Sequence, residues 1–275
     1  GAQGRARWRP GCRTSPPGSS HQPSGAGRSR SAAAPNTQRR RAYASYLGLL
    51  SFVDAQVGFI LGMLAQTGLA ENTHVLYTSD HGDSPGARGL WGKFNFYEES
   101  AKVPMILSGP DVPDGVVCET PVSLIDCHAT ILDGLGVERA SDDPATESRS
   151  LFALAHSDDA PDRPVLSQYH AFASPTGGYM LRKGKYKYHY YVGYRPELFD
   201  LKADPEELHD LAEDAAYKPV LAEMEQSLRE RLDPEAVDAE AKAAQAALIE
   251  RHGGPDKARN VGAPGTTPVP GYGQE

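Results

Sequence analysis

A short polar segment in the first third of the chain combines residue types that hold divalent metal ions. Asp80 and His81 are adjacent, and Gly82 follows them. Aspartate offers a hard anionic oxygen and histidine an imidazole nitrogen, and both bind divalent cations in proteins. Glycine lets the backbone turn tightly beside an ion. The segment therefore predicts a metal site, although the same residues could form a turn in which Asp80 caps backbone amides.

A lysine thirteen residues after Asp80 adds a fixed cation to this chemistry. Lys93 lies in a glycine-rich stretch between Trp91 and Phe94. An ammonium group close to a metal ion can bind sulfate or phosphate and stabilise the charge on a leaving oxygen. A lysine without such neighbours is ordinarily a solvated surface charge. We predict Lys93 as the catalytic cation, provided that the fold brings it to Asp80 and His81.

The surrounding pattern predicts the elements that position these residues. Apolar residues from Tyr46 to Leu64 recur with helical spacing, and residues 73–78 form a short run rich in β-branched and aromatic residues. Asp80 follows this run, at the strand end where open α/β sheets bind ligands. A second strand is expected at 103–108 and a second helix at 121–135. This order predicts an α/β fold with a mainly parallel sheet flanked by helices.

The second half of the chain has a different pattern of expected strands and helices. Strands are expected at 164–169 and 197–201, with a hairpin around Lys183-Gly184 between them, and these predict a small antiparallel sheet. A turn at Asp204-Pro205 and a helix start at Glu206-Glu207 are expected next, and helices follow at 218–232 and 234–251. We divide the chain into four parts: an arm (1–41), an α/β core with the metal-site loop (42–150), an α+β subdomain (151–252) and an extended tail (253–275).

The charge of the chain is unevenly distributed. The net charge is −8, yet residues 1–41 carry nine Arg and no acidic residue. The arm has almost no large apolar residues, so it cannot bury enough surface to offset the entropy of ordering. It is either a disordered arm, a basic arm for nucleic acid, or a coding sequence read out of frame. With three Cys, the chain lacks both a disulfide framework and a Cys-x-x-Cys zinc pattern.

The motifs together resemble the sulfatase family of the alkaline phosphatase superfamily, in the branch of choline-sulfatase-like enzymes and phosphonate monoester hydrolases. The resemblance runs from about residue 41 to about residue 215. It rests on five segments: 77–83 (YTSDHGD), 86–93 (GARGLWGK), 97–100 (YEES), 103–106 (VPMI) and 198–201 (LFDL) followed by 204–207 (DPEE). The resemblance implies an alkaline-phosphatase-like core, only part of which is present here.

The resemblance also implies roles for individual residues. Asp80 and His81 would be metal ligands, and Lys93 would contact the sulfate or phosphoryl group and the leaving oxygen. One divalent ion is expected, with Ca²⁺ as the family's usual metal. Many relatives have Asn in place of His81, and a histidine there makes Mn²⁺, or alternatively Mg²⁺, a candidate. Arg88 stands where some relatives carry a histidine, and we assign it no catalytic role.

The nucleophile that the resemblance implies is not found in the chain. In the family it is a formylglycine made from a Cys/Ser-x-Pro-Ser-Arg motif upstream of the metal strand. The nearest similarity, Cys12 to Pro16, has Thr14 where the motif needs proline and Pro16 where it needs arginine. We reject it as the nucleophile motif. The chain is therefore expected to be a truncated sulfatase with little activity alone.

Three interpretations of function remain open. The first is a metal-dependent sulfuric ester hydrolase, and the second a hydrolase of phosphonate or phosphate mono- and diesters. The third is a non-catalytic fragment or a basic-arm binding module. We expect a small ester as substrate and no nucleic acid, and we keep a homo-oligomer open. No uninterrupted run of about 18 apolar residues occurs, and no secretory signal is visible, so we expect no membrane span and a cytoplasmic location.

Overall fold

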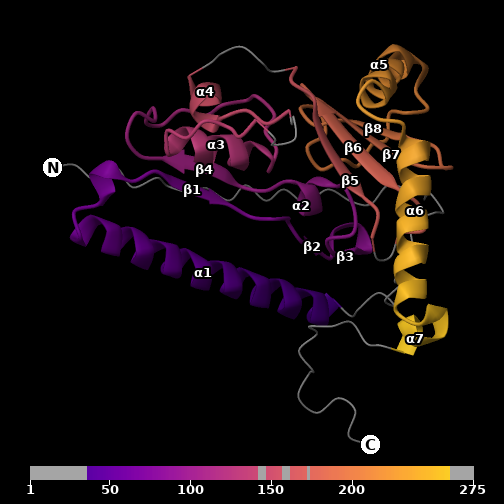
Figure 1. Cartoon of the computed structure of the whole chain (residues 1–275), viewed down its shortest axis with the longest axis horizontal. Coiled ribbons are helices and arrows are strands. Elements are labelled where there is room, and N and C mark those ends of the chain that lie inside the picture. Colours follow the sequence, from indigo (N-terminus) through magenta and orange to yellow (C-terminus); the bar gives the residue numbers. More distant parts are fainter. Residues whose placement is uncertain (1–35, 142–146, 157–161, 172–173, 261–275) are drawn as a thin grey trace, which may run out of the picture.

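The fold, seen in a computed structural model, has two parts (Figure 1). The structure describes residues 36–141, 147–156, 162–171 and 174–260. One part holds the first four helices with two pairs of short strands, and the other holds a four-stranded sheet with the last three helices. The α/β class is confirmed. The division at residue 150 stays a prediction, and residues 1–35 of the predicted arm lie outside the described residues.

A long helix leads to the candidate site. Helix α1 spans Asn36–Gln66, so it includes the predicted helix and also the last six residues of the predicted arm. It ends in a Schellman motif, in which Gly68 N donates to Ala65 O and Leu69 N donates to Leu64 O. Gly68 has a φ of 73°, a conformation that favours glycine. The chain then turns into the strand that carries the metal-site loop.

The first part contains two short strand pairs. Strand β1 (Val75–Thr78) pairs with β4 (Met105–Ser108), and β2 (Ser84–Pro85) pairs with β3 (Trp91–Gly92). Both pairs are antiparallel, with Val75 opposite Ser108 in the first. Strands β1 and β4 lie within the predicted ranges 73–78 and 103–108, whereas β2 and β3 were not predicted. The mainly parallel sheet has no counterpart among the described pairings, because β1 and β4 run in opposite directions.

A buried ion pair joins the third helix to the chain segment before the second part. Helix α3 (Asp126–Gly134) begins five residues later than predicted, and α4 is Leu151–Ala155. Both oxygens of Asp126 accept hydrogen bonds from the Arg163 guanidinium, at 2.7 and 2.8 Å. The carboxylate also accepts backbone amides of Ser123 and Arg149. A buried charge needs this many partners, so the pair fixes α3 against the chain leading into the second part.

The second part is built on a sheet whose strands follow one another in the chain. Its order is β5-β6-β7-β8, and every neighbouring pair is antiparallel. The strands are β5 (Val165–Tyr169), β6 (Gly178–Lys183), β7 (Tyr186–Tyr191) and β8 (Glu197–Asp200). The predicted hairpin is confirmed, and Gly184 takes a φ of 55° in its turn. One face of the sheet forms the main core with the helix that follows. The core residues are Tyr179, Leu181, Tyr188, Leu198, Met224 and Leu228.

Three helices close the chain. Helices α5 (Lys218–Arg229) and α6 (Pro234–Arg251) match the prediction, and the Asp233 side chain before α6 caps the helix by accepting the amides of Glu235 and Ala236. Helix α2 (Glu98–Ala101) is a single turn in the first part. The tail predicted to be extended from residue 253 is instead helical over α7 (Gly254–Asn260), and residues 261–275 lie outside the described residues.

Helix α1 has no buried residue, although apolar residues dominate it from Tyr46 to Leu64. Leu49, Phe52 and Phe59 are each about two-thirds exposed, at 65, 64 and 67%. Figure 1 shows α1 at the margin of the molecule, with other described elements on one side of it. By length and composition alone α1 could cross a membrane, which qualifies our expectation of no span. Core helices pass the same test, and a helix apolar on all sides is normally covered.

The exposed apolar surface of α1 predicts self-association of the isolated chain. Changing Leu49, Phe52 and Phe59 to Lys together should lower the mean particle mass in light scattering, because it removes the apolar surface that copies would share. The matched control places Lys at Ser45, Ser51 and Gln56, which adds the same number of lysines to polar positions of the helix. Equal masses for the two triple variants would contradict the prediction.

Candidate metal and oxyanion site

The loop after β1 is organised by its own side chains. Ser79 Oγ donates to His81 O at 2.9 Å, and Asp80 Oδ1 accepts the His81 amide at 3.0 Å. This is the turn that the structural interpretation of Asp80 predicted. It uses only one carboxylate oxygen, however. The Asp80 side chain is 81% exposed, so its other oxygen, Oδ2, is available to a ligand.

The two ring nitrogens of His81 have different surroundings. Nδ1 lies 2.7 Å from Gly82 O, which is the geometry of an N–H donating to a carbonyl. This contact assigns the proton to Nδ1, so the lone pair of Nε2 can accept a hydrogen bond or bind an ion. Nε2 lies 3.2 Å from Asp80 Oδ2, and Lys93 Nζ contacts the same nitrogen. A backbone carbonyl that fixes the tautomer is the usual support of a metal-binding histidine.

The three residues predicted from the sequence therefore meet at one point. Asp80 Oδ2, His81 Nε2 and Lys93 Nζ converge, although Lys93 reaches the cluster from the loop after β3. Partial loss of solvation acts to raise the pKa of the Asp80 carboxyl group. Electrostatic interaction with His81, backbone hydrogen bonds and the Lys93 ammonium outweigh it and lower that pKa below its usual value. Asp80 is thus a carboxylate at neutral pH, as metal binding requires.

Gly82 seats this loop against helix α2. Its amide donates to Ser100 O at 2.8 Å. A β-carbon at position 82 would lie 2.2 Å from Glu99 O and 3.2 Å from Lys102 O. No side chain fits at that distance, so the backbone approach needs glycine. The position of His81 is consequently tied to the position of α2.

Arg88 holds the same helix from the other side. Its guanidinium donates to both oxygens of Glu99, at 2.8 and 2.7 Å, and contacts Glu206 O. It also lies 4.1 Å from the centre of the Tyr97 ring. Burial, with a contribution from Glu197, raises the pKa of Tyr97, so this phenol stays neutral. Arg88 makes a clamp between loops, which agrees with the decision to assign it no catalytic role.

A buried charge cluster beside α2 was missed by the sequence interpretation. Lys187 Nζ, fully buried on β7, lies 2.8 Å from Glu98 Oε1 and 2.9 Å from Glu207 Oε1. His189 Nδ1, two residues along the strand, lies 3.3 Å from Glu197 Oε2. The sequence predicted this strand only as one side of the hairpin around Lys183-Gly184. A signal was available, because polar residues at alternate positions of a buried strand need buried partners.

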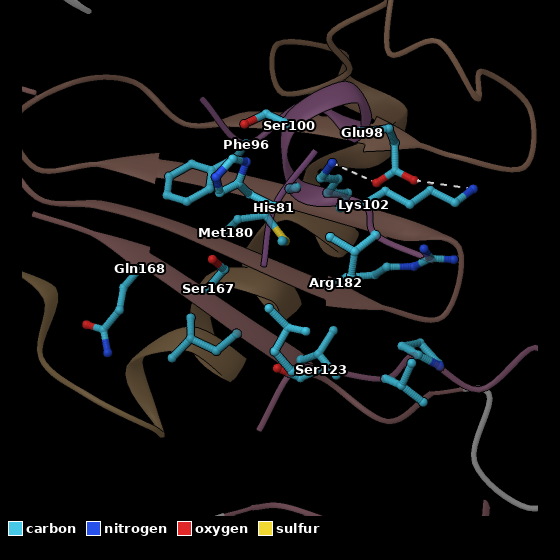
Figure 2. Close-up of a pocket in the computed structure, with 18 of the residues that line it drawn as sticks. His81, Phe96, Glu98, Ser100, Lys102, Ser123, Ser167, Gln168, Met180 and Arg182 are labelled. Carbon is cyan, nitrogen blue, oxygen red and sulfur yellow. Dashed lines mark hydrogen bonds and ion pairs between the residues drawn. The ribbon is translucent and has the colours of Figure 1, made fainter. Parts of the chain in front are cut away.

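The Asp80–His81–Lys93 cluster opens into a cavity of about 740 Å³. The cavity lies between the four-stranded sheet and the loop at 117–124. It is on the face of this sheet that is opposite the main core. Figure 2 shows His81 beside Phe96 and Ser100 at one side, with Met180 and Arg182 of β6 further along. Buried Arg182 Nε has no hydrogen-bond partner among the described residues. The size suits a small organic ester, and the lining is partly basic.

Comparison with known proteins identifies the family. A model of the family "Sulfatase" matches residues 13–137. A second family model, "N-sulphoglucosamine sulphohydrolase, C-terminal", matches residues 86–233, more than half of the chain. The chain belongs to the sulfatase family. The first match spans α1, which favours a place for this helix within the enzyme domain.

Individual relatives of this sulfatase-family chain include enzymes of known name. It is 39% identical to a choline-sulfatase of Rhizobium meliloti (strain 1021) over 174 residues, covering 63% of this chain and 34% of the relative. It is 32% identical to arylsulfatase K of Danio rerio over 202 residues, covering 70% and 38%. The chain thus spans a little over a third of the length of these curated relatives.

Solved structures support the same assignment. A 2-O GAG sulfatase superposes with a TM-score of 0.64 at 28% identity, covering 74% of this chain and 45% of that one. A phosphonate monoester hydrolase from Silicibacter pomeroyi gives 0.59 at 29% identity, covering 69% and 40%. The α/β class and the predicted branch of the superfamily are therefore confirmed.

The sulfatase family generally uses a divalent metal ion. The donor set of this chain fits part of such a site, with one free carboxylate oxygen and one imidazole nitrogen with a fixed tautomer. Within the described ranges, no third His, Cys, Asp or Glu joins them to make a group of three. Sites for Ca²⁺ or Mn²⁺ take more ligands than this. Asp80 and His81 would supply one side of the coordination shell.

The close approach at Gly82 predicts the effect of a single methyl group. Gly82→Ala should lower the free energy of unfolding by about 1–3 kcal/mol, because the β-carbon forces the loop off α2. Urea denaturation measures the change. Gly62→Ala is the matched control, since a β-carbon there meets nothing within 4 Å and alanine favours the helix. A Gly82→Ala protein as stable as the unchanged chain would show that α2 and the loop are not in contact.

Proposed function

We propose that this chain supplies the Asp80–His81–Lys93 side of the active site of a metal-dependent sulfuric ester hydrolase. One observation supports the proposal most directly: Asp80 Oδ2 and His81 Nε2, predicted from one motif, meet Lys93 Nζ, predicted from another, at one cavity. Membership of the sulfatase family gives this geometry its chemical meaning. The activity belongs to an assembly that includes more residues than those of this chain.

The proposed roles follow from the charge of each group. Asp80 and His81 hold the ion through Oδ2 and Nε2, and Gly82 O keeps the proton of His81 on the other nitrogen. A bound divalent ion would neutralise ester oxygens and favour deprotonation of a nucleophile. Lys93 binds a second oxygen of the sulfate group and stabilises negative charge on the leaving oxygen. When an ion binds Nε2, the Lys93 ammonium has to give up its present contact with this nitrogen.

The nucleophile in this proposal comes from outside the 275 residues. The formylglycine of the family derives from a Cys/Ser-x-Pro-Ser-Arg motif, and the sequence contains no such motif. Lys93 and the two ligands can bind and polarise an ester but offer no atom to attack sulfur. The isolated chain is therefore expected to bind metal weakly and to turn over very slowly.

Three metals are candidates for this site. The family resemblance favours Ca²⁺, which prefers oxygen ligands. The imidazole of His81 favours Mn²⁺, because nitrogen donors suit transition metals better than alkaline-earth ions. Mg²⁺ is a third alternative. The rigid placement of Nε2 next to Oδ2 supports a site that uses the nitrogen.

A second candidate function is hydrolysis of phosphonate or phosphate esters. Similarity to the Silicibacter pomeroyi phosphonate monoester hydrolase favours it, as does the histidine at position 81. The three site groups would treat a sulfate and a phosphonate group alike, since both present tetrahedral anionic oxygens. A small ester of either kind fits the cavity.

The metal role can be tested on the chain itself. Asp80→Asn should weaken Mn²⁺ binding about 10-fold or more, and His81→Ala similarly, because each removes one of two ligands. Isothermal titration of Mn²⁺ and then Ca²⁺ into the purified chain measures the affinity. Asp83→Asn is the matched control, since it removes the same charge from an exposed residue three positions further along the loop. Equal weakening by Asp83→Asn would reduce the effect to general electrostatics.

The activity is tested by supplying the missing nucleophile. Grafting residues 42–252 onto the amino-terminal portion of the Rhizobium meliloti choline-sulfatase should give an active hybrid on an aryl sulfate, while the isolated chain stays near the background rate. Lys93→Ala in the hybrid should lower kcat/KM by about 100-fold or more. An aryl phosphonate assayed in parallel decides between the two candidate functions. A soluble, folded hybrid that hydrolyses neither ester would contradict both.

A further inference from the structure

The buried cluster around Lys187 connects the second sheet to helix α2. Lys187 Nζ contacts Glu98 Oε1 at 2.8 Å and Glu207 Oε1 at 2.9 Å. The second oxygen of Glu207 accepts the backbone amide of Glu98 at 2.6 Å. Glu98 is the first residue of α2. Both the side chain and the backbone at the start of this helix are thus held by residues of the second part.

Helix α2 passes this constraint to the metal-site loop. It is only one turn long, so fixing its first residue fixes the whole helix. Its carbonyls at Glu99 and Ser100 are the groups against which Gly82 is seated. Gly82 in turn carries the carbonyl that accepts the proton of His81 Nδ1. A continuous series of contacts therefore runs from Lys187 to His81.

The surroundings of the cluster make its geometry demanding. The charged or titratable groups that face Lys187 and its partners are Glu98, Glu207, His189, Glu197, Lys102 and Tyr97. Lys187 and Glu207 are fully buried. Glu207 also has a φ of 51°, a left-handed conformation that is costly for glutamate. The sequence predicted a helix start there. A buried charge cluster on a strained turn contributes little net stability, and its best-supported use is to specify one geometry.

We propose that Lys187, Glu98 and Glu207 are positioning residues for the metal-site loop. They determine where α2 lies, and through the carbonyls of α2 they set His81 Nε2 beside Asp80 Oδ2. This inference rests on the proposed function for its metal role. Its geometrical content, the coupling of Lys187 to the Gly82 amide, is independent of that function.

A second buried pair in the same chain provides the control. Asp126 and Arg163 form a bidentate ion pair that is also buried. Their other hydrogen-bond partners lie just before α3, at Pro121 and Ser123, and just before α4, at Glu147 and Arg149, and no contact joins them to α2 within the described residues. Breaking this pair should destabilise the protein in the way that breaking any buried pair does. It should leave the contact of the Gly82 amide with Ser100 O unchanged.

The experiment compares Lys187→Met with Arg163→Met in the full chain. Hydrogen exchange of the Gly82 amide is measured by NMR. The denaturant concentration is chosen separately for each variant, so that both have the same free energy of global unfolding. We expect exchange at Gly82 to be about 10-fold faster in Lys187→Met than in Arg163→Met, because only the first releases α2. Mn²⁺ affinity, measured by titration, should fall by about 10-fold in the same variant alone. Lys187→Arg keeps the positive charge, so its Gly82 exchange should be slower and its Mn²⁺ affinity higher than those of Lys187→Met.

Glu98→Gln provides a milder version of the test should Lys187→Met fail to fold. It removes one carboxylate charge and keeps the backbone amide that Glu207 holds. Faster Gly82 exchange in Glu98→Gln than in Asp126→Asn supports the proposal. Equal exchange at Gly82 in the two variants overturns it, whatever happens to metal binding. If the unchanged chain binds no Mn²⁺, the metal role in the proposed function fails, and the exchange rates still decide whether Lys187 positions the loop.

Discussion

The approach of the loop after β1 to helix α2 is the contact on which the candidate site depends. Gly82 lies so close to the α2 carbonyls that no side chain can replace its hydrogen. The backbone there has one stable arrangement, with the Gly82 amide bonded to Ser100 and its carbonyl bonded to His81. Two ordinary side chains, Asp80 and His81, acquire a defined mutual geometry from it. Pre-formed geometry of this kind reduces what a bound ion must reorganise.

The site residues could be identified from the sequence because their signals are local. Asp80, His81 and Gly82 are consecutive, and Lys93 lies in a glycine-rich motif nearby. They can therefore be recognised without knowledge of long-range contacts. The helices at 218–232 and 234–251 were also predicted well, since caps and periodicity are properties of short segments. The direction of strand pairing in the first part was not predicted correctly. Nothing within residues 73–78 or 103–108 indicates the direction of the partner strand.

The buried cluster was missed for a related reason. Lys187, Glu98 and Glu207 are far apart in the sequence, and each alone resembles a surface charge. Only the tertiary structure shows that Lys187 is fully buried and paired twice. Glu207 was expected to start a helix because it follows Asp204 and Pro205. Its left-handed backbone instead places its carboxylate under α2, where tertiary contacts override local preference.

The order of the second sheet has a consequence for how the chain folds. Each strand from β5 to β8 pairs with its neighbour in the sequence, so the contact order of this region is low. Loops that close such pairs are short, and the entropy lost in closing them is small. The sheet can therefore form early, packed on α5, and present Lys187 before the rest of the chain is in place. The metal-site loop would then fold onto a surface that already exists, with the slower, non-local pairing of β1 and β4 completed last.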